Sequence, residues 1–339
     1  MLRSARLAPS AEQLFELAVR ACRSAGQAGG REPLRAAKLR SIRCIKGAAE
    51  AVSDMLREVY TSAPHLNDLH PFYYELCKLS FNVDEYKICL ARLKSIEKIV
   101  NKIFRESALN MRHAQSVKDL RKFRRSFFGR LGSLVESIDG CLAAVRRAQL
   151  AMSRFPEVNL ELATVIIAGA PNVGKSSLLR ALTRAKPEVK PYPFTTKNLV
   201  LGIMEHGAYR VQLVDTPGLL DTPLDEKSKI ERQAILALRH LGDAAVFVVD
   251  PTETCGYPLD FQKRVYDEVS SIFSDHPIIV VANKIDIAID DHLRRMQEFF
   301  PCISYLPVSA EKKINIGRLT ELIIDTLRKE GREHKMLAQ

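Results

Sequence analysis

The residues with the clearest chemical signature form a short loop, Gly169-Ala-Pro-Asn-Val-Gly-Lys-Ser176, which matches the pattern G-x-x-x-x-G-K-[S/T]. A β-branched apolar run precedes it at 163–168 and a helix-forming run follows at 177–182. This strand–loop–helix setting is the one that a phosphate-binding loop needs. The glycines let backbone N–H groups turn inward toward phosphate oxygens, and the start of the helix adds a partial positive charge. The loop therefore predicts a nucleotide site.

Each part of this loop has an expected role. Lys175 is expected to reach the β- and γ-phosphates, and the Ser176 hydroxyl is expected to ligate Mg²⁺. The predicted nucleotide contacts in the loop are Pro171, Asn172, Val173, Gly174, Lys175, Ser176 and Ser177. The alternative is a Gly-rich turn that binds nothing, and the flanking strand and helix argue against it.

A second motif, Asn283-Lys-Ile-Asp286, follows an apolar run at 277–282 and predicts which base is bound. A carboxylate at Asp286 is suited to accept hydrogen bonds from N1–H and the exocyclic amino group of guanine. Adenine lacks this pair of donors, so Asp286 would be left unpaired beside it, which is costly. The motif therefore favours GTP and GDP over adenine nucleotides.

The other expected base contacts come from the same part of the chain. Asn283 is expected to brace the loops, and the stem of Lys284 is expected to cover the base plane. After a further apolar run at 303–307, Ser309 and Ala310 are placed to offer a backbone N–H to guanine O6.

Two segments between these motifs predict a switch. Asp215-Thr-Pro-Gly218 ends the apolar run 209–214, so that Asp215 is placed to hold Mg²⁺ through water and the Gly218 N–H to bond the γ-phosphate. In the Pro-rich segment 191–196 one hydroxyl, Thr196 rather than Thr195, is expected to complete the Mg²⁺ shell. Loss of the γ-phosphate would release both segments. The alternative is that both are ordinary turns.

The position after Gly218 departs from the Ras-like pattern. Leu219 stands where those enzymes place a glutamine that orients the attacking water, and leucine cannot hydrogen-bond a water. Hydrolysis is therefore expected to use another group or to be slow without a partner. Asn172 is a candidate, because related enzymes with asparagine at this loop position use it to hold K⁺ near the β- and γ-phosphates; a role in the turn alone is equally open. The predicted catalytic set is Lys175, Thr196, Gly218 and Asn172.

Length and charge predict two domains. The chain has 339 residues and a net charge of +11, and residues 1–160 carry 28 Lys and Arg against 16 Asp and Glu. All of the basic excess therefore belongs to this first part. We predict a basic, all-α helical bundle over 1–160 and an α/β P-loop GTPase domain, with a mostly parallel sheet flanked by helices, over 161–339.

The helical prediction depends on apolar spacing. No proline occurs between Pro71 and Pro156. Apolar residues at three- and four-residue steps predict one long helix with a stripe of Val117, Leu120, Phe127, Leu131, Leu134, Ile138, Cys141 and Val145. Another stripe contains Ile88, Leu93, Ile96, Ile99, Val100 and Ile103. Gly129 and Gly132 interrupt the first pattern, and 27–31 is expected to be a loop after a helix at about 10–25.

A dense basic run predicts a partner. It contains Arg112, Lys118, Arg121, Lys122, Arg124 and Arg125, with Asp119 as the one acid among them, and Arg130 extends it. Six positive charges against one acid favour contact with phosphates, and RNA is the expected source. The alternatives are a solvated face and an acidic membrane surface; no lipidation motif or spanning segment supports a membrane.

The cysteines and the start of the chain predict a cytoplasmic location. The seven cysteines lack any Cys-x-x-Cys spacing, so neither a zinc site nor a disulfide framework is expected. An odd, scattered set suits a reducing compartment. The first residues lack the long apolar core of a signal peptide.

The chain resembles the Nog family of ribosome-assembly GTPases, which are relatives of the Obg group. The likeness is carried by three stretches: 169–179 with 183–197; 215–221 with 230–240 and 250–257; and 69–73 with 83–87. The resemblance implies an N-terminal helical bundle and a role in maturing a large ribosomal subunit, of the pre-60S or 50S type, through rRNA contact. A chain that ends at Gln339 suits the short archaeal form, without the C-terminal extension of eukaryotic members.

These expectations combine into a GTP-hydrolysing switch that is monomeric when free and does not bind membranes. One alternative is an RNA- or protein-binding scaffold with a structural nucleotide and little turnover, which Leu219 keeps open. Another is a GTPase acting on tRNA or translation, which would share the motifs.

Overall fold

The computed structural model describes residues 6–25, 34–222 and 227–337. The chain divides into two compact units. The first comprises residues 1–69 and 80–153, and the second comprises residues 70–79 and 154–339. The domain boundary expected between residues 160 and 161 stays a prediction.

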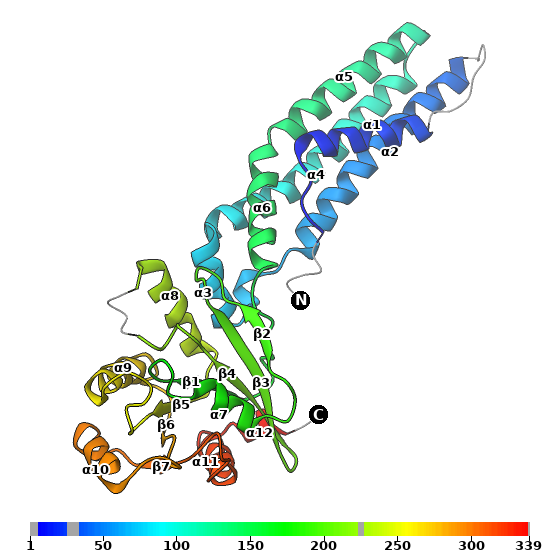
Figure 1. Ribbon diagram of the computed structural model, residues 1–339. Helices are drawn as coiled ribbons and strands as arrows, with labels where there is room; N and C mark the ends of the chain where they lie inside the picture. Colours follow the sequence, from blue (N-terminus) through cyan, green and yellow to red (C-terminus); the bar gives the residue numbers. More distant parts are fainter. Residues whose placement is uncertain (1–5, 26–33, 223–226, 338–339) are drawn as a thin grey trace. The chain divides into compact units, whose positions relative to one another are not determined.

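The first unit is a bundle of helices, as predicted. Its elements are α1 (Ala11–Ala25), α2 (Leu34–Ser62), η1 (Leu66–Asp68), α4 (Val83–Arg112), α5 (Val117–Glu136) and α6 (Asp139–Met152). In Figure 1, α1, α2, α4 and α5 pack along one another. The expected helix at about 10–25 is confirmed as α1, whereas the loop expected at 27–31 lies outside the described residues.

The one long helix predicted from the apolar stripe between Val117 and Val145 is wrong. Two helices, α5 and α6, replace it, and the chain turns at Ser137 and Ile138 between them. The apolar spacing does not reveal the turn because Ile138, within the turn, and Cys141 of α6 are buried and continue the three- and four-residue steps. The glycines expected to interrupt the pattern lie inside α5, where Gly132 allows close approach of the Phe15 ring of α1.

The stripe predicted for α4 is partly correct. Leu93, Ile96, Val100 and Ile103 are buried, but Ile88 and Ile99 are exposed to 65% and 41%. The start of α4 is fixed by Asn82, whose side chain accepts hydrogen bonds from the N–H groups of Asp84 and Glu85. At the start of α5, Ser116 and Asp119 form a reciprocal capping box.

The cysteine spacing predicted no disulfide framework, but the structure contains one disulfide. Cys22 of α1 and Cys44 of α2 form a disulfide. The two cysteines are 22 residues apart in the sequence, and only the packing of α1 against α2 brings them together. A spacing pattern carries no signal for such a pair. Cys77, Cys89, Cys141, Cys255 and Cys302 are free.

The second unit contains a seven-stranded sheet in the order β2-β3-β4-β1-β5-β6-β7. Its strands are β1 (Thr164–Ala168), β2 (Glu188–Pro191), β3 (Asn198–His206), β4 (Tyr209–Asp215), β5 (Ala244–Val249), β6 (Ile278–Ala282) and β7 (Tyr305–Pro307). All neighbouring strands from β4 to β7 pair in parallel, whereas β2 and β3 pair antiparallel to their neighbours. The predicted mostly parallel sheet is confirmed, and so are the strands expected at 163–168, 209–214, 277–282 and 303–307 to within two residues.

Helices cover both faces of this sheet (Figure 1). They are α7 (Lys175–Leu182), α8 (Lys229–Ala237), η3 (Leu238–His240), α9 (Leu259–Ile272), α10 (Asp290–Phe299), α11 (Ile316–Lys329) and α12 (Glu333–Met336). On one face, apolar residues of α7 and α11 share a buried cluster with β1, β4 and β5. On the other face, Tyr266 of α9 contacts the rings of Phe247 and Phe300. The sheet is therefore held rigidly, and the loops at its ends carry the candidate site.

One helix of the second unit comes from the middle of the helical sequence. Helix α3 (Pro71–Ser80) lies between α2 and α4 in the chain but groups with the sheet. Phe72 stacks on Tyr192, with ring centroids 6.4 Å apart, and the Tyr73 hydroxyl donates to the carbonyl of Pro156. The Tyr192 hydroxyl in turn donates to the Ala234 carbonyl of α8.

Candidate nucleotide site

The predicted motifs meet at one edge of the sheet. The parallel strands β1, β4, β5, β6 and β7 all end at the same edge, and each is followed by a loop that carries polar residues. These loops begin at Gly169, Thr216, Asp250, Asn283 and Val308, and Asp215 is the last residue of β4. Ligands of open α/β sheets bind at this edge because the strand ends and helix starts converge there. The topology thus brings together residues that are more than 100 positions apart in the sequence.

Glycine is required at both ends of the phosphate-binding loop. Gly169 has a φ of +143°, and a Cβ there would lie 2.4 Å from the Val248 carbonyl oxygen. Gly174, directly before α7, has a φ of +100°, and a Cβ there would lie 2.3 Å from Nδ2 of Asn283. The loop can therefore wrap closely only because both positions lack a side chain.

Lys175 is held inside the loop. It is 6% exposed, and its Nζ donates to the carbonyls of Gly169 and Ala170 at 2.9 and 2.8 Å. The same Nζ forms an ion pair with Oδ1 of Asp221 at 3.0 Å. The ammonium group therefore lies at the centre of the loop, where the sequence motif predicts a phosphate contact.

The residues expected to hold Mg²⁺ are adjacent to it. The Ser176 hydroxyl donates to Oδ2 of Asp215 at 2.6 Å. Burial raises the pKa of Asp215, and the hydrogen bond from Ser176 and the charge of Lys175 offset only part of that effect. Within the described part of the chain, Oδ1 of Asp215 is buried without a hydrogen-bond partner. A buried, unsatisfied carboxylate oxygen next to a serine hydroxyl fits a hard cation such as Mg²⁺.

The two threonines of the segment 191–196 differ in their environment. The Thr195 hydroxyl donates to the Tyr192 and Lys197 carbonyls, so it is used within the segment. The Thr196 side chain is exposed, and the structure does not bring it into contact with Ser176 or Asp215. Thr196 as the third metal ligand stays a prediction.

The turn after β4, residues 216–221 and hereafter the switch turn, contains a contact that the sequence did not suggest. The N–H of Gly218, expected to bond the γ-phosphate, donates to Oδ2 of Asp221 at 2.8 Å. Gly218 has a φ of +73°, and the Lys197 side chain lies against its Cα. Leu219 is 2% exposed, so its side chain packs inside the unit rather than facing a bound water.

On the base side of the site, Asn283 joins three loops. Its Nδ2 donates to the Val173 carbonyl of the phosphate-binding loop at 2.9 Å, and its Oδ1 accepts from the Ala310 N–H at 3.0 Å. The Ser309 hydroxyl accepts from the Lys312 N–H, which shapes the same turn. Asp286, three residues beyond Asn283, is exposed. The Ala310 N–H, expected to face guanine O6, is thus engaged by the Asn283 side chain.

Lys284 is fixed by a buried acid. Its Nζ lies 2.7 Å from Oδ2 of Asp250 and 3.0 Å from Oγ1 of Thr254. Asp250 is fully buried and also accepts from the N–H groups of Thr252 and Cys255. Burial raises the pKa of Asp250, but the hydrogen bonds from Lys284 and Thr252 outweigh it, so the pKa is lowered overall.

Asn172 lies at the rim of the phosphate-binding loop. It adopts a left-handed conformation with a φ of +60°, which asparagine tolerates better than most residues, and its side chain is exposed. Its Nδ2 is 3.5 Å from the Cys255 carbonyl oxygen. Pro171 and Ser177, also expected to contact the nucleotide, are partly buried on either side of the loop.

The sequence motifs missed Asp221 and Asp250. Asp250 directly follows the apolar strand β5, much as Asp215 is the last residue of β4, and this position at a strand end was the available signal. For Asp221 there was no comparable signal, because its partner Lys175 is 46 positions away.

The basic run forms an exposed surface at the turn from α4 to α5. Arg112, Lys118, Arg121, Lys122, Arg124 and Arg125, hereafter the basic tip, all have exposed side chains, and none forms an ion pair with another described residue. Asp119, the one acid among them, accepts hydrogen bonds from the Ser116 hydroxyl and N–H. Lys38 of α2 donates to the Arg112 carbonyl, which ties this end of the bundle together.

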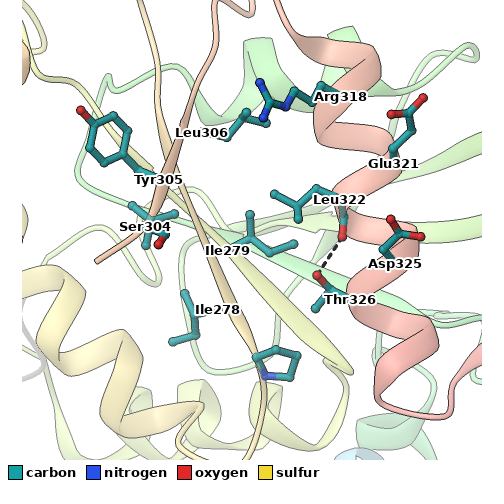
Figure 2. Close-up of a pocket in the computed structure, with 12 residues that line it drawn as sticks. Ile278, Ile279, Ser304, Tyr305, Leu306, Arg318, Glu321, Leu322, Asp325 and Thr326 are labelled. Atoms are coloured by element: carbon teal, nitrogen blue, oxygen red, sulfur yellow. Dashed lines mark hydrogen bonds between the residues drawn. The ribbon is translucent and has the colours of Figure 1, made fainter. Parts of the chain in front are cut away.

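A separate cavity of about 570 Å³ lies between α11 and the strands β6 and β7 (Figure 2). Arg318, Glu321 and Asp325 of α11 line one side of it, and Ile279 and Leu306 line the other. It contains none of the residues of the nucleotide motifs. In the described ranges, no helix combines the length and apolarity needed to cross a bilayer.

Fold and site together define a P-loop GTPase domain preceded by a helical unit. Comparison with known proteins agrees. Residues 3–159 match the family model of the NOG1 N-terminal helical domain, and residues 164–284 match that of a 50S ribosome-binding GTPase. The chain therefore belongs to the Nog family and carries its GTPase domain.

Individual relatives match much of this chain. Nucleolar GTP-binding protein 1 of Encephalitozoon cuniculi is 30% identical over 87% of this chain and 56% of its own length. The Drosophila melanogaster protein of that name is 34% identical over 74% of this chain and 38% of its own. The chain thus spans about half or less of these relatives. One similar solved structure is a crystal structure of a nucleolar GTP-binding protein 1 from Plasmodium falciparum. The two sequences are 28% identical, and the match covers 53% of this chain and 93% of the Plasmodium chain, with a TM-score of 0.46.

Proposed function

We propose that this protein binds GTP with Mg²⁺, hydrolyses it to GDP, and acts as a nucleotide switch in the assembly of a large ribosomal subunit. The observation that carries the proposal is the convergence of Lys175, the Ser176–Asp215 pair and the Gly218 N–H within one loop cluster, with Asn283 linking that cluster to the base-recognition loops. The 50S ribosome-binding GTPase model that matches residues 164–284 supports it.

Guanine specificity is assigned to Asp286. A carboxylate accepts from both N1–H and the exocyclic amino group of guanine, whereas xanthine carries a carbonyl in place of that amino group. Asp286→Asn supplies one acceptor and one donor, which matches xanthine and not guanine. We expect this variant to lose at least about tenfold in GTP affinity and to gain affinity for xanthosine triphosphate, since each unpaired buried group is costly.

Isothermal titration calorimetry of the full chain with GTP, xanthosine triphosphate and ATP measures this exchange. Asp291→Asn, an exposed acid close by in the sequence, is the matched control and should bind like the unchanged protein. An Asp286→Asn variant that keeps the original preference for GTP refutes the base assignment.

The metal ligands proposed are Ser176 and Asp215, with Thr196 joining them when the γ-phosphate is bound. Mg²⁺ supplies charge neutralisation to the β- and γ-phosphates when bound. The Asp215 carboxylate contributes its unsatisfied Oδ1, and the Ser176 hydroxyl, which now donates to Asp215, is within reach of the same position. Lys175 adds positive charge where negative charge accumulates during phosphoryl transfer.

Turnover is proposed to be slow in the isolated protein. Leu219 is buried and cannot orient water, so a group outside this position must do so. Asn172, exposed at the rim of the loop, is the proposed ligand for a K⁺ ion beside the phosphates. The scaffold alternative, with a structural nucleotide and no stimulation by ribosomal particles, is favoured by Leu219 alone.

The proposed partner is the rRNA of a pre-60S or 50S-type particle, contacted by the basic tip. The tip combines six exposed cations with a single acid that is engaged in a helix cap. Such a surface gains affinity from the release of counterions that screen the phosphates. We propose that the free protein is a monomer. The cytoplasm is the proposed location: five of the seven cysteines are free, and the other two form the Cys22–Cys44 disulfide. The curated relatives are named nucleolar.

A further inference from the structure

The acid at the end of the switch turn occupies the two groups on which the γ-phosphate is expected to depend. Oδ1 of Asp221 lies 3.0 Å from Nζ of Lys175, and Oδ2 accepts the Gly218 N–H at 2.8 Å. The carboxylate is only 7% exposed. One side chain thus bridges the phosphate-binding loop and the switch turn, using both of its oxygens.

A γ-phosphate and this carboxylate make the same demands. Each presents anionic oxygens to an ammonium group and a backbone N–H. For Asp221, Oδ1 pairs with the ammonium by charge, without a hydrogen bond within the described residues, and Oδ2 accepts a charge-assisted hydrogen bond from the N–H. The Gly218 N–H can donate to only one acceptor at a time with good geometry, and Oδ2 of Asp221 is that acceptor in the structure. Two anions also repel each other strongly in a buried setting. The carboxylate and the γ-phosphate therefore cannot both hold these donors.

We propose that Asp221 competes with the γ-phosphate for Lys175 and the Gly218 N–H, and so determines the preference of the site between GTP and GDP. With GDP, the contact between Asp221 and Gly218 persists and keeps the switch turn closed. GTP must displace the carboxylate, which releases the chain after Gly218. This inference rests on the proposed function, since it concerns the same nucleotide site.

The test is a change in the ratio of two dissociation constants. Calorimetry of the full chain with Mg²⁺ measures the Kd for GDP and for the slowly hydrolysed analogue GTPγS. In Asp221→Ala we expect the ratio of the GDP Kd to the GTPγS Kd to rise about tenfold, the scale of one charge-assisted contact. Asp221→Asn, which keeps the shape and one acceptor but loses the charge, should raise the ratio by a smaller factor.

Asp325→Asn, an exposed acid on α11, is the control and should leave the ratio unchanged. If either Asp221 variant folds and its ratio stays within twofold of the original or falls, the competition is overturned, because a purely structural role would weaken both nucleotides equally. Asp221→Asn keeps the test available if Asp221→Ala does not fold. Failure of the unchanged protein to bind GTPγS would instead refute the proposed function.

Discussion

At the scale of single residues, the fully buried Asp250 explains how Lys284 is held in the candidate nucleotide site. Its carboxylate receives Lys284, two hydroxyls and two backbone N–H groups. Replacement by asparagine leaves the ammonium group facing an amide that also carries donors. We expect Asp250→Asn to lower the free energy of unfolding by about 2–4 kcal/mol at pH 7, because breaking a buried pair leaves a charge uncompensated.

The pH dependence of this loss follows from the lowered pKa of Asp250. A carboxyl group whose pKa is lower in the folded than in the unfolded state stabilises the fold above the unfolded value, and this contribution declines as the pH falls through the folded value. The difference between the two proteins should therefore narrow in acid. Urea unfolding at pH 7 and well below pH 3.8, the ordinary pKa of an aspartate, measures it. Asp275→Asn, which removes an exposed partner of Arg239, should cost less than about 1 kcal/mol at pH 7.

Residue roles were predictable where the chemistry is local. Lys175 and Ser176 follow from one contiguous loop, and the glycines around them are needed for the same local reason. The lysine partners of Asp221 and Asp250 were not predictable, since each lysine lies far along the chain, although the position of Asp250 at the end of β5 marked it as a possible site residue. Their roles depend on the parallel order of the strands, which places those loops together.

At the scale of elements, the strands were easier to predict than the helix ends. Strands β1, β4 and β6 are buried runs of β-branched residues and were expected almost at their observed bounds. The turn between α5 and α6 was missed because the apolar spacing continues through it. The antiparallel pair β2 and β3 was also missed, because exposed residues such as Val189 break the apolar pattern that marks the other strands.

Helix α3 packs one segment that carries the family resemblance against another. Phe72, from the segment 69–73, stacks on Tyr192 of the segment 191–196, and the Tyr192 hydroxyl reaches α8. Both rings are at most 2% exposed. We expect Phe72→Ala to lower the free energy of unfolding of the GTPase unit by about 3–5 kcal/mol, the usual cost of removing a buried aromatic ring.

Thermal unfolding followed by calorimetry measures this effect. Tyr74→Ala, on the same helix and half-buried, is the control and should cost clearly less. If Phe72→Ala is no more destabilising than Tyr74→Ala, the packing of α3 against this segment is not the contact that stabilises the unit.

At the scale of the whole molecule, charge is divided between the two units as the sequence indicated. The basic excess lies in the helical sequence, and the structure gathers part of it at the turn from α4 to α5. The excess of basic over acidic residues can be counted from the sequence, but the surface that these residues form cannot. Arg112 joins the basic tip only because α4 ends at Arg112 and α5 begins at Val117. The two functions proposed for the chain, nucleotide binding and RNA contact, therefore belong to different units.

This separation makes the RNA contact testable without disturbing the nucleotide site. Replacing Arg121, Lys122 and Arg125 by glutamine removes three charges from one exposed side of α5. Each phosphate contact contributes about 0.7–0.9 to the slope of log affinity against log salt concentration, so the slope should fall by about 2. Affinity at low salt should fall for all rRNA fragments alike, because phosphate contacts carry no sequence information.

Filter binding of large-subunit rRNA fragments over a range of KCl concentrations measures both quantities. The matched control replaces Lys46, Lys94 and Lys98, three exposed lysines of α2 and α4 outside the tip, and should leave the slope nearly unchanged. Both triple variants should bind GDP like the unchanged protein, since the nucleotide site lies in the other unit. Equal slopes for the two variants would mean that the basic excess acts as a diffuse charge, and the tip would lose its assigned role as the rRNA contact.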